Sequence, residues 1–70
     1  MKLTVNGEPC EREVPDLAAL FAAEAEERGI ESAEGIAIAV NGRVVRKTAW
    51  GQTPLNEGDR IEIVRAMQGG

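Results

Sequence analysis

The amino-acid sequence predicts an α+β domain in which one main helix packs on one face of a mixed sheet of about five strands. Two Asn-Gly pairs each follow a short segment with apolar residues, and such a pair is the strongest short-range signal for a β-hairpin. Between the two hairpins lies one segment with apolar residues at helical spacing. The 70 residues suffice for one modest core, because a chain of this length buries only about 60% of its unfolded surface.

The first hairpin is predicted at the start of the chain. Residues 2–5 alternate between polar and apolar side chains, which is the period of a half-buried strand. The Asn-Gly pair at 6–7 forms the turn, since both residue types tolerate a positive φ. A two-residue loop sets Leu3 opposite Cys10, so that Cys10 shares the buried face. We expect the second strand over residues 10–14.

The main helix is predicted from Leu17 to Arg28. Asp16 precedes it and can accept a hydrogen bond from a free N–H of the first turn. Gly29 follows at the place where a left-handed glycine ends a helix. The apolar face carries Leu17, Leu20, Phe21 and Ala25. The residues expected to face water are Glu24, Glu26 and Glu27.

A second hairpin and a last strand complete the expected sheet. Residues 36–40 form a strand, and the Asn-Gly pair at 41–42 is the turn. Residues 47–50 are expected to form a turn or a short 3₁₀ segment, with Trp50 covering one end of the core. The last strand is expected over residues 60–64.

The order of these elements predicts the topology. A helix that follows a hairpin must cross over to reach another strand of the same sheet, and the last strand can then lie beside the first. This is the β-grasp arrangement, expected over residues 1–64 and followed by a flexible tail at 65–70. The predicted core consists of Leu3, Val5, Leu17, Leu20, Phe21, Ile36, Ile38, Val40, Ile61 and Ile63.

The composition argues against several classes of function. The net charge of −4 and the pI near 4.7 argue against a nucleic-acid partner, and no membrane segment is evident near the N-terminus. The chain has no histidine and one cysteine, Cys10, which fits a reducing cytoplasm and offers no metal site. We expect Cys10 to be structural, because it is predicted to face the core. Neither a bound cofactor nor an enzyme active site is expected.

The C-terminal Gly-Gly is the candidate functional site. At a glycine usage of about 7%, two terminal glycines arise by chance in roughly 0.5% of chains. Glycines fit a narrow channel, and residues 66–70, when extended, reach roughly 16 Å beyond the fold. We expect the Gly70 carboxylate to react within another protein's active site, with Gly69, Gln68 and Met67 threading the channel.

A second candidate surface is the sheet face that the helix leaves open. The predicted hairpin register places small apolar residues there: Ala37, Ala39, Val44 and Val64. Such residues suit flat docking by a partner protein. Scattered small apolar residues are also common on an open antiparallel face that binds nothing.

Several segments resemble the ThiS family of sulfur-carrier proteins, which are ubiquitin-like β-grasp proteins. The resemblance spans nearly the whole chain and is carried by residues 3–8, 40–45, 47–50, 55–64 and 69–70. The family often has Pro-Arg where this chain has Arg46-Lys47. The residues before the terminal glycines are variable in such proteins.

The resemblance implies a cycle of activation at Gly70. An adenylating enzyme of the ThiF type, similar to a ubiquitin E1, would use ATP-Mg to form an acyl-adenylate. A persulfide-bearing sulfurtransferase or cysteine desulfurase would displace AMP and leave a thiocarboxylate. Thiazole synthase, of the ThiG type, would accept the sulfur during thiamine biosynthesis. The chain would be a carrier on which these partners act.

Three alternatives remain open at this point. The small subunit of molybdopterin synthase has the same fold and tail but a different sulfur acceptor. A ubiquitin-like modifier would form an isopeptide bond from Gly70 to a lysine. A β-grasp interaction module would carry an incidental Gly-Gly.

Overall fold

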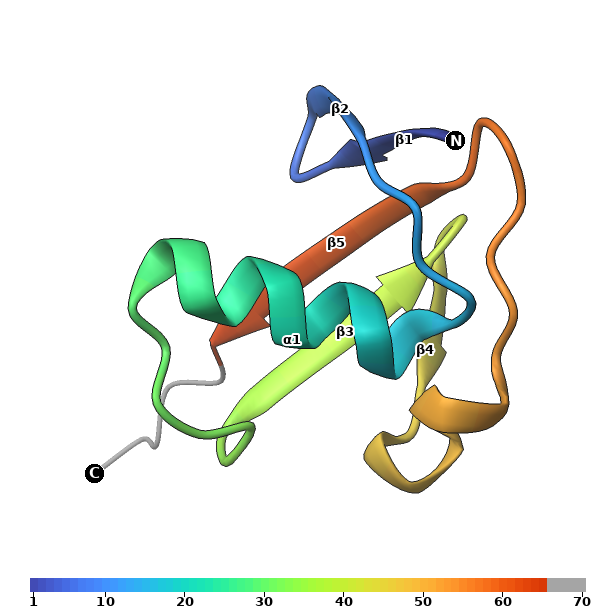
Figure 1. The fold of residues 1–70 in the computed structure, drawn as a ribbon. Coiled ribbons are helices and arrows are strands. Elements are labelled where there is room, and N and C mark those ends of the chain that lie inside the picture. The colour runs from blue at the N-terminus through green and yellow to red at the C-terminus, as the bar shows by residue number, and fades with distance from the viewer. Residues whose placement is uncertain (66–70) are drawn as a thin grey trace.

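The computed structural model describes residues 1–65 of the chain. Its five strands form one sheet in the order β2-β1-β5-β3-β4, and α1 lies across one face (Figure 1). This confirms the predicted fold class. The elements are β1 (Lys2–Val5), β2 (Glu8–Glu11), α1 (Leu17–Arg28), β3 (Ile36–Val40), β4 (Arg43–Val45), the 3₁₀ helix η1 (Lys47–Gln52) and β5 (Arg60–Arg65).

The last strand lies beside the first, as predicted. β5 runs parallel to β1, with Val5 opposite Ile61, and antiparallel to β3, with Ile36 opposite Arg65. The strand therefore extends one residue further than the sequence predicts. Because β5 has a neighbour on each side, the C-terminal strand is the central strand of the sheet.

Both Asn-Gly turns form with two successive left-handed residues. The φ angles are 52° at Asn6 and 82° at Gly7, and 53° at Asn41 and 85° at Gly42. A two-residue loop of this type matches the twist of the strands that it joins. The registers of both hairpins are those predicted from the loop length.

The two turn asparagines also fix β5 in the sheet. The Asn6 backbone N–H donates to the Ile61 carbonyl at 2.9 Å. Its side-chain amide accepts from the Ile63 N–H at 2.8 Å and donates to the Ile63 carbonyl at 3.2 Å. The Asn41 backbone N–H donates to the Arg60 carbonyl at 2.7 Å, and its Oδ1 accepts from the Arg60 N–H at 2.9 Å. Its side-chain Nδ2 donates to Asp59 Oδ1 at 3.0 Å. The Asn6 amide thus continues the β1–β5 ladder beyond the end of β1.

Both ends of α1 are capped as predicted. The Asp16 carboxylate accepts a hydrogen bond from the Ala19 N–H at 2.9 Å. At the other end Gly29 has a φ of 73°, and the Ile30 N–H donates to the Ala25 carbonyl at 2.8 Å. This last bond is the one expected of a Schellman ending.

The core lies between α1 and the sheet. Its buried hydrophobic members are Leu3, Val5, Leu17, Leu20, Ile38, Trp50, Leu55, Ile61 and Ile63. Three predicted members are only half-buried against this cluster: Phe21, Ile36 and Val40. Leu55 is absent from the predicted core because it lies in an irregular loop, where neither strand nor helix spacing indicates an inward position.

Trp50 covers one end of the core, as predicted. It lies in η1 and is almost fully buried. Its indole Nε1 donates to the Val45 carbonyl at 2.9 Å, and its ring centroid lies 5.1 Å from that of Phe21. The indole nitrogen therefore has a partner, as a buried tryptophan requires.

The second strand is displaced from the predicted residues 10–14: it begins two residues earlier, at Glu8, and ends three residues earlier, at Glu11. β2 ends at Glu11, which is opposite Lys2 at the start of β1, so pairing has no further strand to follow. The Arg12 N–H still donates to the Met1 carbonyl at 3.0 Å, after which the chain turns toward α1. Val14 packs against the core from this connection and not from a strand.

The prediction that Glu24 faces water is wrong, since it is only 4% exposed. Arg28 and Arg12 each donate to one of its oxygens at 2.9 Å, and Arg12 also lies 2.9 Å from Glu27. Burial alone would raise the pKa of Glu24, but hydrogen bonds from Arg28 and Arg12 outweigh it and lower the pKa below its usual value. The ion-paired cluster ties the segment after β2 to α1.

Candidate functional site

The tail residues predicted to react or to thread a channel lie outside the described residues. They are Met67, Gln68, Gly69 and Gly70. The structure does place the strand from which they extend. β5 pairs with β1 at Arg60 and Ile61 and with β3 from Ile61 to Arg65, and its inward residues Ile61 and Ile63 are buried in the core. The tail therefore extends from the central strand, and its attachment to the body is firmly held up to Arg65.

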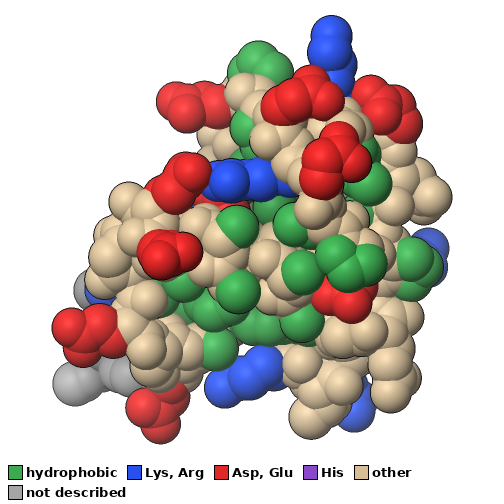
Figure 2. Space-filling view, viewed as in Figure 1, with side chains coloured by type: hydrophobic (Ala, Val, Ile, Leu, Met, Phe, Trp, Pro, Cys, Tyr) green, Lys and Arg blue, Asp and Glu red, His purple; other side chains and the backbone are tan. Residues whose placement is uncertain are grey.

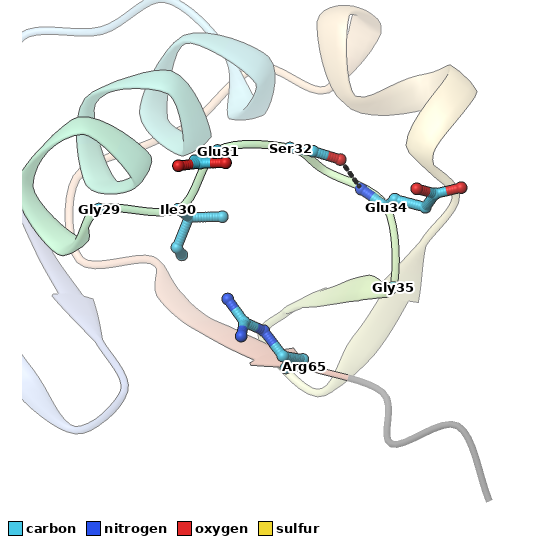
Figure 3. A pocket seen from close by; sticks show the side chains of 7 residues that line it. All are labelled: Gly29, Ile30, Glu31, Ser32, Glu34, Gly35 and Arg65. Atoms are coloured by element: carbon cyan, nitrogen blue, oxygen red, sulfur yellow. Dashed lines mark hydrogen bonds between the residues drawn. The ribbon is translucent and has the colours of Figure 1, made fainter. Parts of the chain in front are cut away.

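An open hollow of about 620 Å³ lies beside the end of β5, between the end of α1 and the start of β3 (Figure 3). It is lined by Gly29, Ile30, Glu31, Ser32, Glu34, Gly35 and Arg65. The Arg65 side chain points into it from the sheet, and the Glu34 N–H donates to Ser32 Oγ at 2.9 Å (Figure 3). These lining groups suit polar contacts with a partner and place no base beside a nucleophile.

The open sheet face has the composition that the register predicts. Ala37 lies opposite Val64, and Ala39 lies opposite Val44, all on the face away from α1. Val44 and Val64 are 73% and 55% exposed, whereas the two alanines are half-buried between them. These four residues form one apolar patch over β4, β3 and β5, and β5 is the strand that leads to the tail.

The other half of this face is polar. Glu62 lies opposite Ala39 at the edge of the apolar patch, and Arg60 lies opposite Thr4 on β1. A partner that covered the open face would meet apolar side chains near β4 and charged ones near β1. The docking role of the face stays a prediction.

Cys10 occupies a structural position. It lies opposite Leu3 in β2 and packs half-buried against the core, as predicted. Within residues 1–65 no three acidic, cysteine or histidine side chains gather in a way that could hold a metal ion. None of the helices in this part of the chain is long and apolar enough to cross a membrane.

The fold and its C-terminal strand define the class of protein. The chain is a small β-grasp domain with an apolar patch on its open face and a central C-terminal strand that leads to Gly69-Gly70. The sequence model of the ThiS family matches residues 3–70. The chain therefore belongs to the ThiS family.

Solved structures agree with this assignment. The crystal structure of the thiamine biosynthesis protein ThiS from Geobacter metallireducens is 30% identical over the full length of both chains, with a TM-score of 0.80. The solution structure of a thiamine biosynthesis protein from Geobacter metallireducens is also 30% identical. That match covers 100% of this chain and 88% of the other, with a TM-score of 0.72. No curated protein sequence matches the chain.

Family membership confirms the resemblance seen in the sequence. It identifies the chain as a small sulfur carrier of thiamine biosynthesis. The assignment favours this function over the molybdopterin synthase subunit, the protein modifier and the bare interaction module.

Proposed function

We propose that the chain carries sulfur as a thiocarboxylate on Gly70. The observation that carries this proposal is the position of β5, which is the central strand and leads directly into the Gly-Gly tail. Five residues follow Arg65, and when extended they span roughly 16 Å. The folded body can then stay at the surface of a partner while the carboxylate enters its active site.

The first proposed step activates the carboxylate. A ThiF-type adenylating enzyme binds the tail, and a Gly70 carboxylate oxygen attacks the α-phosphorus of ATP in the presence of Mg²⁺. Pyrophosphate leaves and an acyl-adenylate forms. This step is needed because a carboxylate is a poor electrophile, whereas AMP is a good leaving group.

The second step installs the sulfur. The terminal sulfur of a persulfide on a sulfurtransferase or cysteine desulfurase attacks the acyl carbon and displaces AMP. A thiol then reduces the resulting acyl disulfide and releases the thiocarboxylate. A ThiG-type thiazole synthase accepts the sulfur from it. We expect these steps in the cytoplasm, where ATP and thiol reductants are abundant.

The apolar half of the open sheet face is the proposed contact with the adenylating enzyme. The apolar patch of Ala37, Ala39, Val44 and Val64 is the part best suited to it, because exposed valines flank two half-buried alanines. Burial of such a patch favours association without requiring polar groups to be matched. The patch includes Val64 of β5, the strand from which the tail continues in the sequence.

The test is intact-mass analysis after incubation with ATP-Mg, the cognate adenylating enzyme and a persulfide donor. The full chain should gain the mass difference between sulfur and oxygen. Chains that lack Gly70, or that carry Gly69→Val, should gain none and should unfold at the same temperature as the full chain. Gly69→Val acts by widening the thread and restricting its backbone. Sulfur uptake by the Gly70-deleted chain, or conjugation of the full chain to lysines, would refute the proposal.

A further inference from the structure

Charge is unevenly divided along this acidic chain. Residues 8–34 carry nine of the twelve acidic side chains and only two of the eight basic ones. No acidic residue occurs between Glu34 and Glu57, and that stretch contains Arg43, Arg46 and Lys47. A chain with a net charge of −4 therefore contains a segment of 22 residues whose charges are all positive.

The fold keeps this division in space. The basic stretch forms β3, β4 and η1, and β4 is an edge strand of the sheet. Acidic side chains gather instead over α1 and the β1–β2 hairpin (Figure 2). The three basic residues are all exposed. We call the surface formed by Arg43, Val44, Arg46 and Lys47 the cationic edge.

The basic side chains of the cationic edge differ from Arg12 and Arg28 in their ion pairs. Arg12 and Arg28, in the acidic half, are both bound to Glu24. By contrast, no ion pair among residues 1–65 involves Arg43, Arg46 or Lys47. Within residues 1–65, the cationic edge thus keeps its charges free of ion pairs.

Apolar surface accompanies these charges. Val44 is 73% exposed between Arg43 and Arg46 in the sequence, and it belongs to the apolar patch of the open face. On the other side of β4 lies an open hollow of about 360 Å³, lined by Val40, Asn41, Arg43, Val45 and Thr53. Because side chains alternate across a strand, Val44 lies on the open face, whereas Arg43 lies with Val40 and Val45 on the face toward α1. Exposed apolar surface next to charged side chains is common in protein–protein contacts.

A protein partner fits this surface better than a nucleic acid does. Single-stranded nucleic acids bind through stacking on exposed aromatic side chains. The chain has one tryptophan, one phenylalanine and no tyrosine, and Trp50 and Phe21 pack against each other in and beside the core. The net charge of −4 also opposes a phosphate backbone.

We propose that the cationic edge binds an acidic surface of the adenylating enzyme, with an apolar side chain of that enzyme against Val44. The inference rests on the proposed function and names the chemistry of the partner's surface. An acidic partner is repelled by the acidic half of the carrier and attracted by the cationic edge, so one orientation of approach is favoured. That orientation brings the apolar patch toward the enzyme, because Val44 belongs both to the cationic edge and to the patch.

The test compares two double variants of the full chain with the same net charge. Arg46→Gln with Lys47→Gln removes two charges from the cationic edge. Lys2→Gln with Arg60→Gln removes two from β1 and β5, whose exposed side chains lie on the other half of the open face. Binding to the purified cognate adenylating enzyme is measured by calorimetry at low and near-physiological salt.

We expect the wild type to bind more weakly as salt rises. The Arg46/Lys47 variant should bind about 3- to 30-fold more weakly at low salt and lose most of this salt dependence. The Lys2/Arg60 variant should stay within about two-fold of the wild type, since its charges lie on the polar half of the open face, away from the cationic edge and the apolar patch. Both variants should unfold at the wild-type temperature, because all four side chains are exposed.

Two further outcomes separate the alternatives. Wild-type-like binding by the Arg46/Lys47 variant, or equal weakening of both variants, would overturn the cationic edge while leaving the proposed function intact. A wild type that neither binds the enzyme nor becomes adenylated would refute the proposed function and this inference with it. Single-stranded RNA and anionic vesicles are the remaining probes. Binding to either that only the Arg46/Lys47 variant loses, with enzyme binding unchanged, would overturn the inference in favour of that ligand.

Discussion

Replacing Asn6 by glycine tests whether the turn asparagine holds the strand that leads to the tail. Asn6 has a φ of 52°, which glycine adopts freely, so the turn itself is preserved. What disappears is the pair of side-chain hydrogen bonds to the N–H and carbonyl of Ile63, which are partly buried. The variant therefore separates the shape of the turn from the attachment of β5.

The magnitude follows from these two bonds. A hydrogen bond contributes about 0.5–1.5 kcal/mol net, so their loss costs about 1–3 kcal/mol. Glycine adds up to about 1 kcal/mol through the entropy of the unfolded chain. Asn41→Gly carries the same entropy term, because Asn41 has a φ of 53° in the same kind of turn, but its side-chain bonds are exposed. We expect Asn6→Gly to lose about 1 kcal/mol more than Asn41→Gly.

The assay is urea unfolding of the wild type, Asn6→Gly and Asn41→Gly, monitored by the fluorescence of Trp50. Asn6→Asp is an informative companion, since it keeps the acceptor for the Ile63 N–H but loses the donor to the Ile63 carbonyl. The free energy of unfolding of Asn6→Asp should lie between the values for the wild type and Asn6→Gly. It falls below both values where the Ile63 carbonyl repels the new carboxylate. Equal losses in Asn6→Gly and Asn41→Gly would show that the Ile63 bonds contribute nothing, and the reasoning would fail.

Three other predictions concern the ion-paired cluster, the thiol and the open face. Glu24→Gln should cost about 1–3 kcal/mol at neutral pH, because charged hydrogen bonds to Arg28 and Arg12 are lost. Since the pKa of Glu24 is lowered in the folded state, its contribution is complete above the ordinary value of 4.5 and is lost as pH falls through the folded pKa. Urea unfolding of wild type and variant at neutral pH and at a pH below the folded pKa of Glu24 checks this. A difference in the free energy of unfolding that persists in acid would contradict it. Cys10→Ala should fold and still gain sulfur by intact mass, because Cys10 packs against the core; a folded variant without uptake would contradict its structural role. Ala39→Arg should weaken adenylating-enzyme binding in calorimetry without lowering the melting temperature, and an unchanged affinity would remove the open face from the contact.

Much of this fold can be predicted from short-range patterns in the sequence. The Asn6-Gly7 and Asn41-Gly42 turns set both hairpin registers, since a two-residue loop leaves only one pairing. The ends of α1 follow from Asp16 and Gly29, whose conformations are local. The positions of Ala39 and Val44 on the open face follow in turn from the register. The family resemblance and the Gly-Gly signal are also properties of the sequence alone.

Only the tertiary structure shows which polar groups meet. Glu24 looks like a water-facing helix residue until the chain brings Arg12, twelve positions away, against α1. The Asn6 amide meets Ile63 across 57 positions, and Leu55 is buried from a loop without any repeat. The end of β2 at Glu11 likewise depends on where its partner strand begins. Turns and caps depend on neighbours in the chain, whereas these contacts depend on elements that only the folded sheet and helix bring together.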